Sequence, residues 1–127
     1  MALRRLQEKV TKENLWIYIL SLLRERPLYA YEIKERIRDR FGFEPATITA
    51  YVVLYRLERE GLVESKQEKG ASDKVVRRYY RITEKGLQTV EAGKEFLKRV
   101  IKMLEPAEGG PDVDKSLADR HVCQDRQ

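Results

Sequence analysis

The side chains of this chain that could do chemistry are cations and hydroxyls in its middle third. Residues 64–81 carry a net charge of +3, because Glu64, Glu68 and Asp73 are outnumbered by Lys66, Lys69, Lys74, Arg77, Arg78 and Arg81. A second group precedes it and contains Thr47, Thr49, Tyr51, Tyr55, Arg56 and Arg59. Guanidinium, ammonium and hydroxyl groups donate hydrogen bonds to phosphate oxygens. This pattern predicts recognition of a polyanion.

Residue types that build most catalytic centres are scarce. The single cysteine, Cys123, and the single histidine, His121, both lie within the last seven residues, where we expect them to be inert. This excludes a disulfide framework, a Cys/His zinc site and a Ser-His-Asp or Cys-His arrangement held in a core. We therefore expect a protein that is not an enzyme and that has no cofactor and no metal.

Length and charge point to one small, highly charged domain. The chain has 127 residues, of which 42% are hydrophobic and 37% charged, and its net charge is +5. The positive charge belongs to residues 1–82, because residues 83–127 sum to −1. The longest uncharged, mostly apolar run, Leu15–Leu23, is far below the roughly 20 residues that a membrane span needs. We expect a cytoplasmic protein with no membrane segment.

Hydrophobic spacing predicts three helices in the first half of the chain. The first covers residues 3–26, with a break near residues 11–14, and ends at Pro27. The second covers residues 30–41 and is closed by Gly42. The third opens near Ala46 or Thr47 and ends at Gly61. In the third helix the core stripe is Ala50, Val53, Leu54 and Leu57, and the outward residues are Thr47, Thr49, Tyr51, Val52, Tyr55, Arg56 and Arg59.

A hairpin and a fourth helix follow. Two extended segments, residues 62–68 and 74–82, are joined by a Gly-containing turn. Thr83 is a candidate cap for a helix that runs to about Glu105, before Pro106. Its apolar residues form a heptad-like seam interrupted by Lys94: Leu87, Val90, Leu97, Ile101 and Leu104. So wide an apolar arc favours dimerisation. Beyond residue 106 the composition predicts a loosely ordered tail.

This order of elements predicts a mainly α, α+β fold: a winged helix-turn-helix with a two-stranded β wing and a long C-terminal dimerisation helix. The predicted parts are a DNA-binding domain, residues 1–82, a dimerisation helix, residues 83–105, and a flexible tail, residues 106–127. In such a fold the third helix lies in the major groove and the wing contacts the DNA backbone.

The sequence resembles the PadR-like transcriptional regulators from about Leu15 to Leu104. The resemblance rests on Leu22–Leu28, on Tyr31–Ile33, on Thr49–Tyr51 leading to Leu54 and Arg56–Val63, and on Arg77–Gly86. It implies a homodimer, usually a repressor, whose C-terminal helix packs on the partner's first helix and which senses a small-molecule effector in some members. Three positions depart from the family pattern: Ala30 and Ile48 stand where the family usually has glycine, and Val52 where it usually has proline.

Together, the residues and the resemblance give two candidate sites. The DNA-binding residues are Tyr31, Thr47, Thr49, Tyr51, Val52, Tyr55, Arg56, Lys74, Arg77 and Arg78. The dimerisation residues are Leu3, Leu6, Leu87, Val90, Lys94, Leu97, Ile101 and Leu104.

Several of these residues also have a purely structural interpretation. Arg77 and Arg78 could be ordinary solvated strand residues, Tyr51 could cover the edge of the core, and Thr47 could only cap its helix. Neighbouring Tyr79 and Tyr80 must point to opposite faces of a strand, so one of them belongs to the core.

Trp16 is more typical of a core or dimer interface than of a ligand platform, and Lys94 either extends outward to solvent or marks a polar cavity between subunits. The function that we expect is a DNA-binding transcriptional regulator. The alternatives are a winged helix used for protein–protein assembly and a nonspecific nucleic-acid-binding module.

Overall fold

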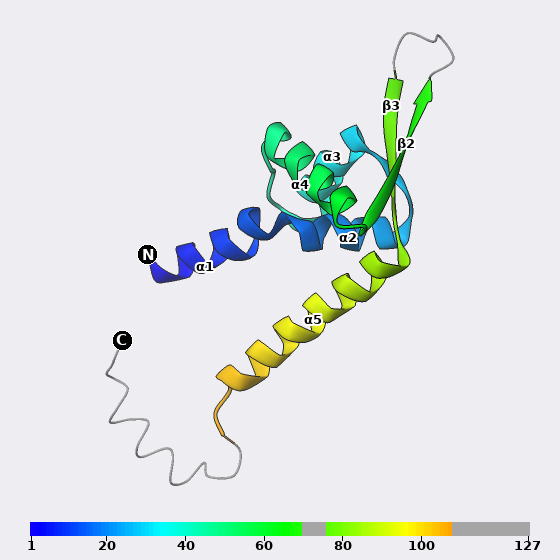
Figure 1. The fold of residues 1–127 in the computed structure, drawn as a ribbon. Helices are drawn as coiled ribbons and strands as arrows, with labels where there is room; N and C mark the ends of the chain where they lie inside the picture. The colour runs from blue at the N-terminus through cyan, green and yellow to red at the C-terminus, as the bar shows by residue number, and fades with distance from the viewer. Residues whose placement is uncertain (70–75, 108–127) are drawn as a thin grey trace. The chain divides into compact units, whose positions relative to one another are not determined.

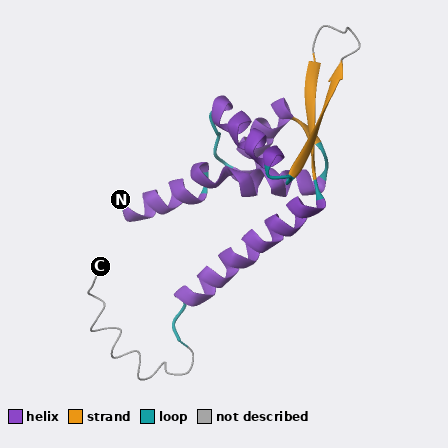
Figure 2. Cartoon of the chain, viewed as in Figure 1, coloured by secondary structure: helices purple, strands orange, loops and turns teal. Residues whose placement is uncertain are grey.

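The computed structural model describes residues 1–69 and 76–107 of the chain (Figure 1). Its elements are α1 (Ala2–Val10), the short 3-10 helix η1 (Lys12–Asn14), α2 (Leu15–Glu25), β1 (Leu28–Tyr29), α3 (Ala30–Phe41), α4 (Thr47–Arg59), β2 (Val63–Lys69), β3 (Val76–Ile82) and α5 (Glu84–Leu104). Figure 2 shows the same elements by type, with the strands confined to one short sheet. None of the described helices is long and apolar enough to cross a membrane.

The predicted break in the first helix is confirmed. The Thr11 hydroxyl donates to the carbonyl of Gln7 at 2.7 Å, and the Asn14 side-chain amide donates to the carbonyl of Lys9. These side chains satisfy carbonyls at the end of α1 that would otherwise continue a helical ladder, and so they favour a turn at this point. The apolar helix α2 then starts anew at Leu15.

The sheet has three antiparallel strands in the order β1-β3-β2. The β2–β3 hairpin is the predicted two-stranded wing, and β1 is a third strand that the sequence did not predict. Strand β1 comprises only two residues, with Leu28 opposite Tyr80 and Tyr29 opposite Tyr79. On the other side of β3, the register runs from Val63 opposite Ile82 to Lys69 opposite Val76. Strand β1 therefore fixes the base of the β2–β3 hairpin to the segment that leads into α3.

One core holds α2, α3, α4, the sheet and the start of α5 together. Its buried members are Leu15, Ile19, Leu20, Leu22, Leu23, Leu28, Ile33, Ile37, Ala50, Leu54, Leu57, Leu62, Val63, Tyr80 and Val90. Trp16 and Val53 are partly buried against this core, as their spacing predicts. Tyr80 is the core member of the Tyr79–Tyr80 pair, and burial raises the pKa of its phenol.

Two helix ends are set by specific side chains and glycines. Gly42 closes α3 in the left-handed conformation, with a φ of 80°, which costs a glycine little. The Thr83 hydroxyl accepts from the Gly86 backbone N–H at 3.0 Å and donates to the carbonyl of Gly61 at 2.7 Å. The predicted cap of α5 is thereby confirmed, and the same hydroxyl fixes α5 to the turn between α4 and β2.

The chain forms two compact units, and the division falls inside α5. The first unit is Met1–Gly93, and the described part of the second is residues 94–107. The first turns of α5 belong to the first unit because Gly86 and Val90 are buried there. The first compact unit thus includes residues 84–93 of α5.

Candidate nucleic-acid interface

Helix α4 turns a broad face to solvent, opposite the stripe that it buries. Its spacing places Ile48, Val52, Tyr55 and Arg59 along the centre of that face, at steps of four, three and four residues. Ile48 is 76% exposed, Tyr55 59% and Val52 48%. The Arg59 guanidinium lies 5.7 Å from the centre of the Tyr55 ring, a cation–π contact that holds the cation on this face.

The predicted residues of α4 lie on this face or beside it. Tyr51, which is 47% exposed, faces a small hollow towards α3 together with Thr47 and Tyr31. Arg56 lies at the other margin, beside Trp16, and Thr49 is exposed. The structure therefore separates Tyr51 and Arg56 to opposite margins, and places the aliphatic side chains of Ile48 and Val52 at the centre between them.

A lysine that sequence reasoning missed holds the start of α4. The Lys34 ammonium of α3 donates to the Thr47 hydroxyl at 2.8 Å and pairs with the Glu44 carboxylate at 3.6 Å. It thereby links the two helices of the helix-turn-helix and places a positive charge beside the first turn of α4. Its position among the alternating charges of residues 32–40 carried no signal of this role.

The β2–β3 hairpin presents its arginines on both faces. Arg78 shares a face with the buried Tyr80 and donates to the Ser65 hydroxyl at 3.0 Å. Ser65 in turn donates to the Glu58 carboxylate of α4 at 2.7 Å. This relay ties the wing to the C-terminal turn of α4, and it leaves Arg78 exposed beside that helix. Lys74 lies outside the described residues.

Arg77 lies on the opposite face, above a cluster of tyrosines. Its guanidinium is 5.6 Å from the Tyr31 ring centre and 6.0 Å from that of Tyr29. The Tyr29 and Tyr31 rings are stacked, with centres 5.7 Å apart, and the Tyr79 ring lies 4.8 Å from Tyr29. Tyr31 is 52% exposed, so the cluster gives Arg77 an aromatic support at the surface.

A hydrogen bond joins this cluster to the wing. The Tyr29 hydroxyl donates to the Glu68 carboxylate at 2.6 Å. That hydrogen bond is the main reason why the pKa of Tyr29 lies above its ordinary value, and the negative charge of Glu68 adds to the effect. The phenol therefore stays protonated at neutral pH, and the link between β1 and β2 persists there.

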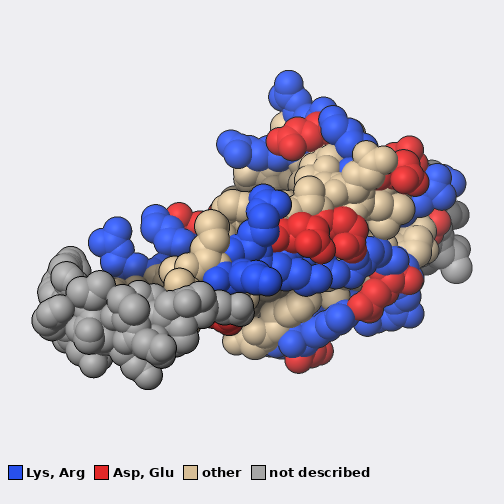
Figure 3. All heavy atoms as spheres, turned by 90° about the horizontal axis from the view of Figure 1, so that it is seen from below, with Lys and Arg blue, Asp and Glu red and all other residues tan. Residues whose placement is uncertain are grey.

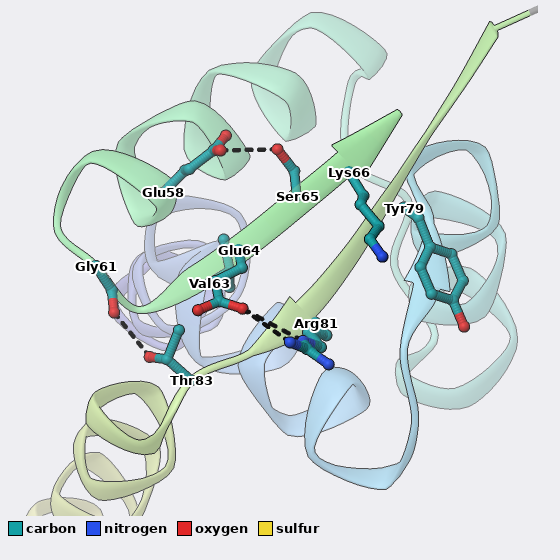
Figure 4. Close-up of a pocket in the computed structure, with 9 residues that line it drawn as sticks. All are labelled: Glu58, Gly61, Val63, Glu64, Ser65, Lys66, Tyr79, Arg81 and Thr83. Atoms are coloured by element: carbon teal, nitrogen blue, oxygen red, sulfur yellow. Dashed lines mark hydrogen bonds and ion pairs between the residues drawn. The ribbon is translucent and has the colours of Figure 1, made fainter. Parts of the chain in front are cut away.

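A hollow of about 520 Å³ lies beside β2, at the base of the hairpin (Figure 4). Three charged side chains of its wall have partners within the wall: Arg81 bonds Glu64 at 3.1 Å, and Glu58 accepts from Ser65. Figure 4 shows both pairs, together with the hydrogen bond from the Thr83 hydroxyl to the Gly61 carbonyl. Arg81 thus has an ion-pair partner on the neighbouring strand.

Charge on other parts of the surface is mixed. On the face shown in Figure 3, Lys and Arg side chains lie interleaved with Asp and Glu side chains. The net charge of +5 is therefore not spread evenly over the surface. The evidence for a polyanion site comes from α4 and the wing. Within residues 1–69 and 76–107, no group of three His, Cys, Asp or Glu could hold a metal ion.

The residues predicted for dimerisation differ in exposure and fall into three classes. Large apolar side chains are exposed at Leu3 (65%), Leu6 (59%), Leu97 (40%), Ile101 (61%) and Leu104 (79%). Leu87 and Lys94 are only half-buried. Val90 is fully buried in the core of Met1–Gly93, so its side chain has no surface to offer a partner.

The fold and this surface together define a class. Helices α2, α3 and α4 followed by the β2–β3 hairpin form a winged helix-turn-helix, in which α4 is the recognition helix and the hairpin is the wing. Residues 19–92 match the model of the transcriptional regulator PadR-like family, and the chain belongs to that family. The predicted resemblance is confirmed, and the chain is a PadR-family transcription regulator.

Several known proteins are similar to this chain. The chain is 35% identical over 86 residues to an uncharacterized protein of Lysinibacillus sphaericus, with 66% of this chain and 72% of that protein covered. A PadR family transcriptional regulator of Eggerthella lenta is 32% identical, with a TM-score of 0.66, and the match covers 84% of this chain and 95% of that one. A PadR family transcription regulator of Clostridium difficile is also 32% identical, with a TM-score of 0.60, and the match covers 69% of this chain and 94% of that one.

A more distant structure shares the fold. PadR of Bacillus subtilis, solved in complex with operator DNA, is 21% identical with a TM-score of 0.60, and the match covers 89% of this chain and 60% of that one.

Proposed function

We propose that this chain is a homodimeric repressor that binds a specific operator in the cytoplasm and is released from it by a small-molecule effector. The observation that carries the proposal is the solvent-facing surface of α4, where hydroxyl, guanidinium and aliphatic groups stand together on a helix already anchored by its opposite face. A major groove admits one α-helix, and such groups contact base edges and phosphates.

The wing supports the same proposal. Arg77 is held at the surface by tyrosine rings, and Arg78 is held beside the end of α4 by Ser65. Preorganised cations of this kind lose little side-chain freedom on contact with phosphate. They would fix the protein on the duplex while α4 reads the sequence.

Dimerisation is supported by the exposed apolar residues of α1 and of the second half of α5. Two recognition helices on one dimer would enter successive major grooves about 34 Å apart on a pseudo-palindromic site. Effector release is supported by a hollow of about 390 Å³ within Met1–Gly93, with Trp16 and Val53 in its wall and Arg56 at its edge. A ligand there would touch α4 directly.

Alanine variants of the wing arginines should flatten the salt dependence of DNA binding. If each arginine neutralises one phosphate, Arg77→Ala and Arg78→Ala should each reduce the slope of log affinity against log salt by about 0.9 and lower affinity on all duplexes alike. The measurement is fluorescence anisotropy over a range of salt concentrations.

Arg81→Ala is the matched control for this test. It lies on the same strand but is paired with Glu64, so its salt slope should stay near that of the parent chain. If Arg77→Ala and Arg78→Ala leave the slope unchanged as well, these two arginines do not contact phosphate.

A further inference from the structure

The centre of the recognition surface is aliphatic, and the fold does not explain why. Ile48 and Val52 lie one helical turn apart, 76% and 48% exposed, while the core stripe of α4 faces the other way. Polar residues would be the ordinary choice at such a place, because exposed aliphatic side chains add nothing to the core. Their position suggests that an apolar group of a binding partner covers them.

We propose that Ile48 and Val52 read the 5-methyl groups of thymines in the major groove, an inference that rests on the proposed function. The thymine methyl is the apolar group on the base edges of that groove, and aliphatic side chains bury it by contact. Neither side chain can hydrogen-bond, so the pair would favour thymine over cytosine without a donor or acceptor.

The position of the two residues within α4 suits this role. Recognition helices contact base edges with their N-terminal residues. Ile48 is the second residue of α4 and Val52 the sixth, and Lys34 fixes the first turn through Thr47. A rise of 1.5 Å per residue separates them by about 6 Å along the helix, close to two base-pair steps of roughly 3.4 Å each. The operator should therefore carry two thymine methyls within about two base steps.

Charge around the pair favours DNA over a protein partner. Arg56 and Arg59 follow the aliphatic residues on α4, and Lys34, which pairs with Glu44, stands at the beginning of the helix. The carboxylate of Glu58 is turned to Ser65 and the wing. An apolar strip bordered by cations complements a groove whose floor carries methyl groups and whose walls carry phosphates.

Deoxyuridine substitution tests the proposal, because it removes the thymine methyl and nothing else. The 127-residue chain would first select its site from a random duplex library. Each thymine of the recovered duplex would then be replaced in turn, and affinity measured by anisotropy. We expect a loss of about fourfold at one or two positions, the effect of one buried methyl group. Ile48→Ala should bind the thymine duplex more weakly and lose the sensitivity at one of these positions.

Two variants serve as controls. Ile48→Val keeps aliphatic methyl groups and should retain the deoxyuridine effect, and Val52→Ala should remove the effect at the other position. Both residues are exposed, so each variant should melt within a few degrees of the parent chain.

The outcomes separate this inference from the proposed function. Recovery of a specific site that no deoxyuridine weakens would overturn the inference, assign the aliphatic pair to a protein partner and leave DNA recognition intact. A deoxyuridine effect that persists in both alanine variants would overturn it too, because another side chain would then read the methyl. Failure to recover any preferred sequence would instead contradict the proposed function.

Discussion

A chain carrying Leu97→Glu and Ile101→Glu should be monomeric and bind its operator about 10² to 10⁴ times more weakly than the parent chain. Both side chains are exposed, at 40% and 61%, and with Leu104 they follow steps of four and three along one stripe of α5. A buried carboxylate without a partner is strongly unfavourable in an apolar interface. The loss of affinity follows because each half-site would then be bound without the effective concentration that a linked second domain supplies.

Light scattering after size-exclusion chromatography would measure the mass of the variant, and anisotropy would measure its affinity. Lys98→Glu is a matched control, because one lysine-to-glutamate change alters the net charge by the same −2 and Lys98 is an exposed residue paired with Glu95. It should stay dimeric. A dimeric double-glutamate variant with parental affinity would show that this stripe of α5 is not the interface.

Gly86→Ala should lower the free energy of unfolding by about 3 kcal/mol, even though alanine is ordinarily the better helix former. A Cβ atom at residue 86 would lie 2.2 Å from the backbone oxygen of Leu62 and 2.6 Å from Cγ1 of Ile82. The first of these is a backbone atom at the start of the wing, so relief requires α5 to move away from β2. For a domain of this size the melting temperature should fall by 10 °C or more.

Thermal unfolding followed by circular dichroism would measure the change. Gln88→Ala, at an exposed position two residues along the same helix, should leave the melting temperature unchanged or slightly raised. If Gly86→Ala also raised the melting temperature, as helix propensity alone predicts, the close approach of α5 to Leu62 would be wrong.

Periodicity predicted the helices and their faces, because spacing along a helix determines which residues share a side. The stripe of Ala50, Val53, Leu54 and Leu57 is buried or partly buried, and the predicted outward residues of α4 are exposed. The same local logic placed the Gly42 end of α3 and the Thr83 cap of α5. Where contacts are local, residue types and their spacing are enough to predict helices, their buried faces and their ends.

What the sequence did not predict depends on contacts between distant segments. Strand β1 has two residues between Pro27 and α3, too few for a periodic pattern, and exists because Leu28 and Tyr29 pair with β3 about 50 residues later. Val90 fitted the heptad seam by spacing, yet it packs into the core of Met1–Gly93. Lys34 lacked a signal because its contact with Thr47 arises only when α3 and α4 are placed together.

The measurement that tests the central claim most directly is anisotropy of the 127-residue chain on its selected duplex and on a scrambled duplex of the same composition, each at two salt concentrations. Recognition by α4 and the wing predicts a preference of about 10³-fold or more for the selected duplex, together with a steep loss of affinity as salt rises. Equal affinity for the two duplexes at both salt concentrations would contradict sequence-specific recognition.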